Sequence, residues 1–105
     1  TWITDWYVND VENENGLVNT FSLSQNYPNP FNPATIIRYS IAQPGLVTLR
    51  VYDVLGREVL ELVNEEKAAG SYDINFNASK LSSGVYMYKI ESGSYQEAKK
   101  MILVK

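Results

Sequence analysis

Hydrophobic and polar residues alternate with a period of two along most of the chain after residue 20. This spacing is typical of a β-strand that buries one face in a core and turns the other toward solvent. Residues 58–69 come closest to a helical period, through Val59, Leu62 and Val63, but glycines bound this segment and its neighbours read as strands. We therefore predict an all-β fold. The expected inward positions are Ile37, Tyr39, Val47, Leu49, Val51, Ile74, Phe76, Tyr86 and Tyr88.

Turn-forming residues divide the chain into about seven short strands, at the spacing expected for an antiparallel β-sandwich. Residues 65–70 are charged and contain alanine, and we expect a loop there. Residues 77–84 are expected to form a longer corner, with Leu81 as an apolar plug. The expected strands cover residues 21–23, 35–41, 47–52, 58–63, 72–76, 86–90 and 95–105.

Residues 26–33 have the sequence Asn-Tyr-Pro-Asn-Pro-Phe-Asn-Pro and are called the Asn-Pro segment here. They hold all but one of the four prolines of the chain. Proline fixes φ, lacks a backbone N–H donor and drives the preceding residue toward extended geometry. We therefore predict a stiff, irregular segment that leads into the strand at residues 35–41.

The chain has 105 residues, which is enough for one domain. Residues 2–8 are rich in aromatic side chains, and residues 9–16 are polar and acidic. We interpret residues 1–20 as the end of a preceding domain or a strand-adding arm, followed by an acidic linker, and residues 21–105 as the domain. The net charge is −3, and all the charged residues of the first twenty are acidic, so the domain itself is nearly neutral. The absence of a basic stripe argues against a nucleic-acid partner.

The composition also excludes several kinds of catalysis. The chain has no cysteine and no histidine, which rules out a cysteine nucleophile and a serine–histidine triad. The remaining candidates are the carboxylates of Asp53, Glu58 and Glu61, which we interpret as solvated, and Ser82 and Ser83, which suit a turn. We therefore expect neither an active site nor a cofactor.

Two further patterns are compatible with binding but have simpler interpretations. Residues 10–16 alternate oxygen ligands as in a calcium loop, but the glycine and the closing acidic ligand are misplaced, so we expect a linker and no metal. Tyr52, Tyr86, Tyr88 and Tyr95 are candidates for a sugar-binding face, although such tyrosines are mostly core residues or cross-strand partners. No apolar run approaches a membrane span, and the start lacks a signal-peptide pattern. The chain begins with Thr1 and not with methionine, so we interpret it as a processed product or an excised piece of a longer protein.

Five motifs of the chain follow one another in the order found in a known family. They are the Asn-Pro segment, Ile37-Arg38-Tyr39, the run Val-Tyr-Asp-Val-Leu-Gly-Arg-Glu-Val at residues 51–59, Leu81-Ser82-Ser83-Gly84-Val85-Tyr86, and Lys100-Met101-Ile102-Leu103-Val104-Lys105. The sequence resembles the C-terminal sorting domain of proteins exported by the type IX secretion system. It also resembles the immunoglobulin-like domain of the flagellar hook-capping protein. The resemblance covers residues 21–105 and implies a seven-stranded antiparallel immunoglobulin-like β-sandwich.

The resemblance implies an export address and not a catalyst. In the family, the cargo crosses the outer membrane of a Gram-negative bacterium from the periplasm, and a sortase-like peptidase then removes the sorting domain. The cargo is released or anchored at the cell surface. The implied partners are the secretion machinery, the peptidase and an upstream cargo domain, and the cut would fall within residues 9–20.

The resemblance also assigns the sorting signal to particular residues. They are Pro28, Asn29, Pro30, Gly84, Tyr86, Lys100, Leu103, Val104 and Lys105. The last strand is expected to be an edge strand with unpaired backbone groups, to which a receptor docks by strand addition.

Two other functions stay open at this point. The chain could be a structural immunoglobulin-like module in which residues 2–8 add as a strand to a second copy, and a mass measurement at varied concentration would show this. It could also be a carbohydrate-binding module of a secreted hydrolase, which a polysaccharide pull-down would show.

Overall fold

The computed structural model describes residues 20–105, and this part of the chain folds into strands joined by turns and short connections. It confirms the all-β prediction. The predicted aromatic arm and acidic linker fall almost entirely in residues 1–19, outside the described residues. The strands are β1 (Ser22–Leu23), β2 (Ala34–Ile41), β3 (Gly45–Tyr52), β4 (Glu58–Lys67), β5 (Gly70–Asn77), β6 (Gly84–Ser92) and β7 (Tyr95–Leu103).

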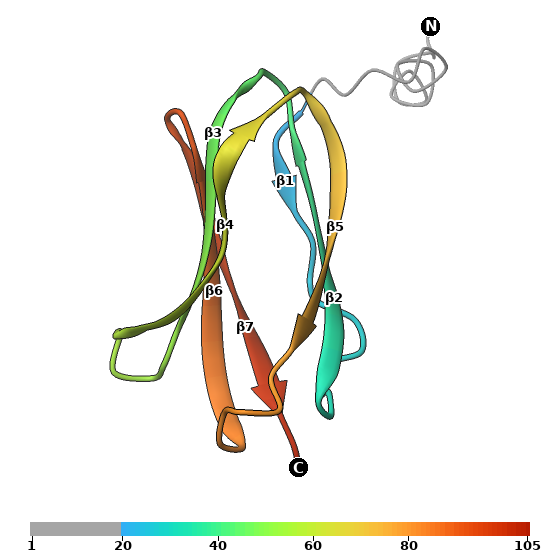
Figure 1. Ribbon diagram of the computed structural model, residues 1–105, viewed down its shortest axis with the longest axis vertical. Coiled ribbons are helices and arrows are strands. Elements are labelled where there is room, and N and C mark those ends of the chain that lie inside the picture. Colours follow the sequence, from blue (N-terminus) through green and yellow to red (C-terminus); the bar gives the residue numbers. More distant parts are fainter. Residues whose placement is uncertain (1–19) are drawn as a thin grey trace, which may run out of the picture.

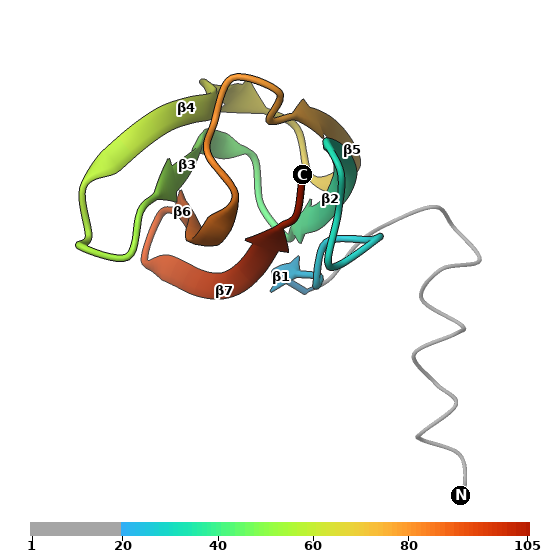
Figure 2. The ribbon, with the colours of Figure 1, turned by 90° about the horizontal axis from the view of Figure 1, so that it is seen from below.

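The strands form two facing sheets. One sheet has the order β1-β2-β5 and the other has the order β4-β3-β6-β7, and every pairing is antiparallel. Figure 1 shows the sheets side by side, with β1 starting near the upper end and the C-terminus at the lower end. Figure 2, seen from below, shows β1 beside β7, so the two layers meet on that side. This arrangement confirms the predicted seven-stranded immunoglobulin-like β-sandwich.

The hydrophobic core lies between the two sheets. All the predicted inward residues are buried except Ile74, which is half-buried because β5 is an edge strand. Phe31 of the Asn-Pro segment is also part of the core, and Leu81 of the corner packs against it. The buried hydrophobic residues are Leu23, Phe31, Ile37, Tyr39, Ile41, Val47, Leu49, Val51, Val63, Phe76, Ala78, Tyr86, Tyr88, Ile90, Met101 and Leu103.

The prediction of a charged loop at residues 65–70 is wrong for most of this segment. Glu65, Glu66 and Lys67 continue β4, where they pair with residues 45–47 of β3, so only two alanines connect β4 to β5. The pairing satisfies their backbone groups, and charged side chains on an edge strand also discourage further strand addition. Two register shifts in the β3–β4 ladder interrupt the alternation of β4, which explains its misleading helical spacing.

The protein is expected to unfold in alkaline solution as its buried tyrosines ionise. Tyr39 and Tyr88 are fully buried, and burial raises the pKa of each to about 12. Because the folded-state pKa lies above the ordinary value of about 10, folding favours the neutral phenols. Their contribution to stability is therefore complete below pH ~10 and is lost as the pH rises toward the folded pKa.

This pH dependence can be followed by tyrosinate absorbance and circular dichroism in the same titration. We expect the last tyrosines to ionise in the transition that unfolds the domain, and we expect Tyr39→Phe to move that transition to higher pH. Ionisation of every tyrosine with the fold intact would contradict the prediction.

Candidate functional site

The motif segments that the sequence singles out meet at one end of the sandwich. This end, called the C-terminal pole, consists of the Asn-Pro segment, the corner at residues 78–84 and the last residues, 100–105. All three lie in the lower part of Figure 1. Backbone contacts join them: Phe31 forms a parallel bridge to Leu103, and Leu103 pairs with Gly84. The structure therefore brings together residues that are more than seventy positions apart in the chain.

The Asn-Pro segment covers the outer edge of the last strand. The Ile102 N–H donates to Asn29 Oδ1 at 3.0 Å, and the Phe31 N–H donates to the Ile102 carbonyl at 2.9 Å. The Val104 N–H in turn donates to the Phe31 carbonyl at 2.9 Å. The expectation of unpaired backbone groups at the end of the chain is therefore wrong. The segment bends at residues 28–30 and again at residues 32–33, and between the two bends Phe31 pairs with β7 through an isolated bridge.

A buried hydrogen-bond network fixes the start of the Asn-Pro segment. Asn26 is buried, and its side-chain amide donates to the Pro28 carbonyl at 3.2 Å and to Thr35 Oγ1 at 3.0 Å. The Asn26 N–H donates to the Tyr88 hydroxyl at 2.8 Å, and this hydroxyl donates to the Ser24 carbonyl at 2.6 Å. Because buried polar groups need hydrogen-bond partners, this network fixes the position at which residues 28–30 reach the surface. The sequence offered only one sign of it, namely an asparagine ahead of the prolines.

The corner at residues 78–84 holds the last residue of the chain. The Lys105 N–H donates to Ser83 Oγ at 3.0 Å, and Lys105 Nζ donates to the Ser79 carbonyl at 2.7 Å. Gly84 begins β6 with φ of 154°, a backbone conformation that favours glycine. Tyr86 also binds this corner, since its hydroxyl donates a hydrogen bond to the Ser82 carbonyl at 2.7 Å. This bond from a tyrosine near a strand start to a carbonyl four residues upstream is a feature of immunoglobulin-like domains.

The predicted signal residues fall into two groups according to their exposure. Pro28, Asn29, Pro30, Lys100, Val104 and Lys105 are exposed at the surface of the pole. Tyr86 and Leu103 are only 8% and 1% exposed, and Gly84 lies between the groups. A receptor that binds the folded domain can contact the first group directly. Tyr86 and Leu103 can act only by supporting the surface from within the core.

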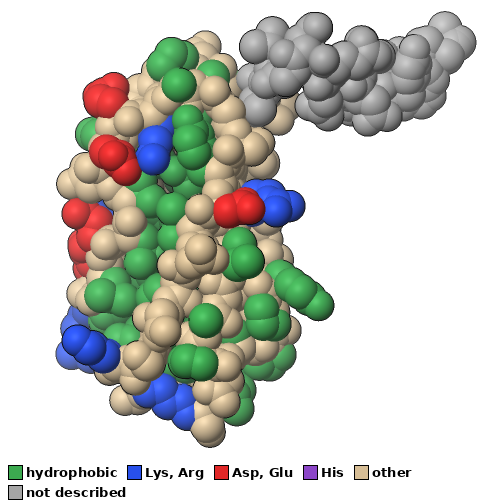
Figure 3. Space-filling model, turned by 45° about the vertical axis from the view of Figure 1, so that its right-hand side comes forward, with side chains coloured by type: hydrophobic (Ala, Val, Ile, Leu, Met, Phe, Trp, Pro, Cys, Tyr) green, Lys and Arg blue, Asp and Glu red, His purple; other side chains and the backbone are tan. Residues whose placement is uncertain are grey.

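The pole also carries the lysines that lack a carboxylate partner. In residues 20–105, Lys80, Lys100 and Lys105 make no ion pair, whereas every other Lys and Arg lies within 4.0 Å of an Asp or Glu. Figure 3 shows basic side chains at the lower end of the molecule, where this face carries no acidic side chain. All three side chains are exposed, and no carboxylate of residues 20–105 neutralises them, so they can pair with an acidic partner.

The tyrosines proposed for a sugar-binding face do not form one. Tyr86 and Tyr88 lie in the core, and Tyr95 is half-buried and stacks on Phe21 at 4.9 Å between ring centroids. Tyr52 is on the outer face of β3, so the four rings share no platform. The structure thus contradicts the tyrosine face on which the carbohydrate-binding alternative rested.

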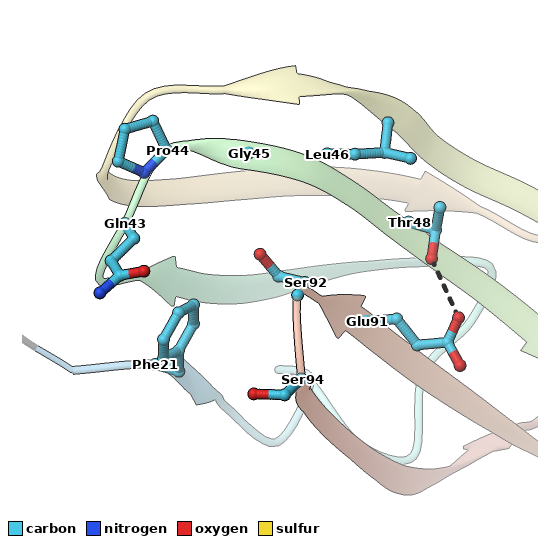
Figure 4. Close-up of a pocket in the computed structure, with 10 residues that line it drawn as sticks. Phe21, Gln43, Pro44, Gly45, Leu46, Thr48, Glu91, Ser92 and Ser94 are labelled. Atoms are coloured by element: carbon cyan, nitrogen blue, oxygen red, sulfur yellow. Dashed lines mark hydrogen bonds between the residues drawn. The ribbon is translucent and has the colours of Figure 1, made fainter.

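A hollow of about 560 Å³ lies at the opposite pole, between the β2–β3 connection and the β6–β7 hairpin. Figure 4 shows Phe21, Gln43 and Ser94 around it, with Thr48 Oγ1 at 3.5 Å from Glu91 Oε1. None of these groups forms a nucleophile–base pair, because the hydroxyl of Thr48 meets only an ion-paired carboxylate.

Among the described residues, no three acidic side chains gather as metal ligands. Within the same residues, no helix meets the length and hydropathy of a membrane span.

Removing the Tyr88 hydroxyl is expected to destabilise the domain more than removing the Tyr86 hydroxyl. Tyr88→Phe leaves the buried Asn26 N–H and the Ser24 carbonyl without a partner and should cost about 1–3 kcal/mol. Tyr86→Phe frees only the carbonyl of the exposed Ser82, which water can reach, and should cost about 0.5–1.5 kcal/mol. Urea melts of both variants measure the difference, and the reverse order would contradict the assigned network.

Three comparisons with known proteins bear on this site. The model of a family described as the secretion system C-terminal sorting domain matches residues 25–105. No curated protein matches the sequence. Dimeric latent PorU from Porphyromonas gingivalis is structurally similar, with a TM-score of 0.60 and 22% identity, over 83% of this chain and 10% of PorU. PorZ, a surface component of the type-IX secretion system of the same organism, gives a TM-score of 0.48 and 17% identity, over 90% of this chain and 12% of PorZ.

The chain thus spans only about a tenth of either solved protein, and at these identities the likeness to PorU concerns the fold alone. The family match is different in kind, because it includes the Asn-Pro segment, the corner and the terminal residues that form the C-terminal pole. It confirms the resemblance found in the sequence. The chain belongs to the family of secretion system C-terminal sorting domains.

Proposed function

We propose that the C-terminal pole is the surface by which the type IX secretion machinery recognises this chain. As a sorting domain, the chain directs a larger protein across the outer membrane, to the cell surface or into the medium. The observation that supports the proposal is the convergence of three segments, distant in sequence, on one exposed surface.

Within this surface, the proposed contacts are the exposed side chains of Pro28, Asn29, Pro30, Lys100, Val104 and Lys105. Gly84, Tyr86 and Leu103 act as supports, because they fix the corner and the last strand on which the exposed residues sit. Recognition of a folded surface is favoured over strand addition, since the outer backbone groups of Ile102 and Val104 already have partners.

The remaining assignments follow from the type of domain. Residues 1–20 join the domain to a cargo, and a sortase-like peptidase cuts within residues 9–20 after export. Residues 21–105 then act as an address without catalysis of their own, as is typical of sorting domains.

A reporter fusion tests the proposal. A periplasmic reporter is joined upstream of the full 105-residue chain and expressed in a bacterium with an active type IX system. We expect the reporter on the cell surface or in the medium, and we expect it in the periplasm when the chain is absent or when the system is inactivated. Retention of the intact fusion in the periplasm of competent cells would overturn the proposal.

A further inference from the structure

The outer face of the four-stranded sheet carries a charged cluster, and a group of apolar side chains lies between this cluster and the C-terminal pole. In the C-terminal half of β3, Arg50 lies among Glu58, Glu61 and Glu91, and Lys89 also pairs with Glu91. Toward the C-terminal pole, the cross-strand pairs are apolar: Tyr52 faces Met87, and Val85 faces Ile102. These four residues are called the outer patch. Solvent-facing sides of antiparallel sheets are usually polar, so a group of apolar side chains there indicates a contact surface.

The β3–β4 hairpin extends the outer patch with two more apolar side chains. Val54 and Leu55 follow Tyr52 of this patch after one intervening residue, and they are 71% and 72% exposed. They form the hairpin tip, which projects at the lower left of Figure 1. Two adjacent apolar side chains with so much exposed surface are unusual at a hairpin turn, where polar residues and glycine are typical.

Asp53 holds the hairpin tip in a single geometry. Its carboxylate accepts hydrogen bonds from the N–H groups of Leu55 at 2.9 Å and Arg57 at 3.0 Å, and from Arg57 Nε at 2.9 Å. The Asp53 N–H donates to the Arg57 carbonyl, and the Gly56 N–H donates to the Asp53 carbonyl, both at 2.9 Å. The bonds from Arg57 and Leu55 hold the pKa of Asp53 below its usual range, so they persist at neutral pH. A rigid tip loses little conformational entropy when it binds.

The charges beside this surface indicate the kind of partner. Lys100 pairs with Met87 across the β6–β7 ladder, so it borders the outer patch, and it has no carboxylate partner in residues 20–105. Arg57 also borders the tip, but Asp53 already neutralises it. Glu58 pairs with Tyr52 across the β3–β4 ladder, and its carboxylate lies 3.7 Å from Arg50 Nε, so Lys100 is the bordering charge that has no opposite charge beside it among residues 20–105. The complementary surface is therefore an apolar groove with Asp or Glu residues at its rim.

We propose that the hairpin tip and the outer patch form a second docking surface, which inserts Val54 and Leu55 into an acidic-rimmed apolar groove on a protein of the export machinery. The inference rests on the proposed function and deepens it, because it adds Val54 and Leu55, which lie outside the C-terminal pole, to the proposed contacts. Central apolar anchors with a charged neighbour are the usual composition of an interface hot spot.

The test compares export of reporter fusions that carry the full parent chain or a variant of it changed at the surface. Val54→Ser with Leu55→Ser should lower export by about ten-fold or more, because it removes both anchors. Leu46→Ser is the matched control. Leu46 is an exposed apolar residue of β3 at the opposite pole, and its substitution should leave export within about two-fold of the parent. Thermal melts verify that all the variants are folded.

The outcomes separate this inference from the proposed function. If the parent fusion is exported and the folded Val54→Ser, Leu55→Ser variant is exported equally well, the second docking surface is overturned while the export function stands. If the parent itself is retained, the proposed function fails. A concentration-dependent dimer of the parent chain that the double variant abolishes would assign the hairpin tip to a second copy and overturn the proposed partner.

Discussion

Removal of Val104 and Lys105 is expected to reduce export of a fused cargo by at least about ten-fold while the domain stays folded. Both side chains are exposed at the C-terminal pole, and they lie beyond the last paired residue of β7. The deletion loses three hydrogen bonds, from the Val104 N–H, the Lys105 N–H and Lys105 Nζ. Hydrogen bonds of this kind are worth about 0.5–1.5 kcal/mol each, so the three together contribute about 1.5–4.5 kcal/mol. This sum is smaller than the stability of about 5–15 kcal/mol that is typical of a folded domain.

A second variant separates recognition from stability. Val104→Ala with Lys105→Ala keeps the backbone, and with it the bond from Val104 to Phe31, but removes the side chains that a receptor would contact. It should fail in export as the deletion does, with a melt closer to that of the parent. Lys89→Ala is the control, because Lys89 is paired with Glu91 away from the pole. Export of both terminal variants at the parental level would refute the role of these two residues.

Phe31→Ala is expected to destabilise the domain by about 3–5 kcal/mol. The ring is 2% exposed and packs on Phe76 with 6.1 Å between the ring centroids. Its loss leaves a cavity at the point where the backbone of Phe31 bridges to Leu103, so the Asn-Pro segment should also loosen from β7. Denaturant melts give the change in the free energy of unfolding.

The neighbouring Tyr27→Ala provides the matched control for this prediction. Tyr27 belongs to the same segment and is also aromatic, but it is 79% exposed. Its substitution should change stability by no more than about 0.5 kcal/mol. A loss below about 1 kcal/mol for Phe31→Ala would show that the Asn-Pro segment is not anchored through this ring.

The sequence by itself determined the fold class and the strands. Val47, Leu49 and Val51 occupy every second position, and only a strand with one buried face accounts for that spacing. The alternation failed in β4, where two register shifts break the period. At Ile74 it held, but this side chain is only half-buried because β5 is at the edge of its sheet. Both effects depend on the neighbouring strands, which a local pattern does not contain.

The sequence also identified the segments of the candidate site, because prolines restrict the backbone wherever they occur and because the motifs follow the order of a family. Only the tertiary structure decided how these segments are arranged. The bond between Asn29 and Ile102 joins residues 73 positions apart, and it exists only once both sheets have packed. The same packing buries Leu103 and Tyr86 and leaves Val104 and Lys105 exposed, since the exposure of a side chain depends on what the rest of the chain places against it.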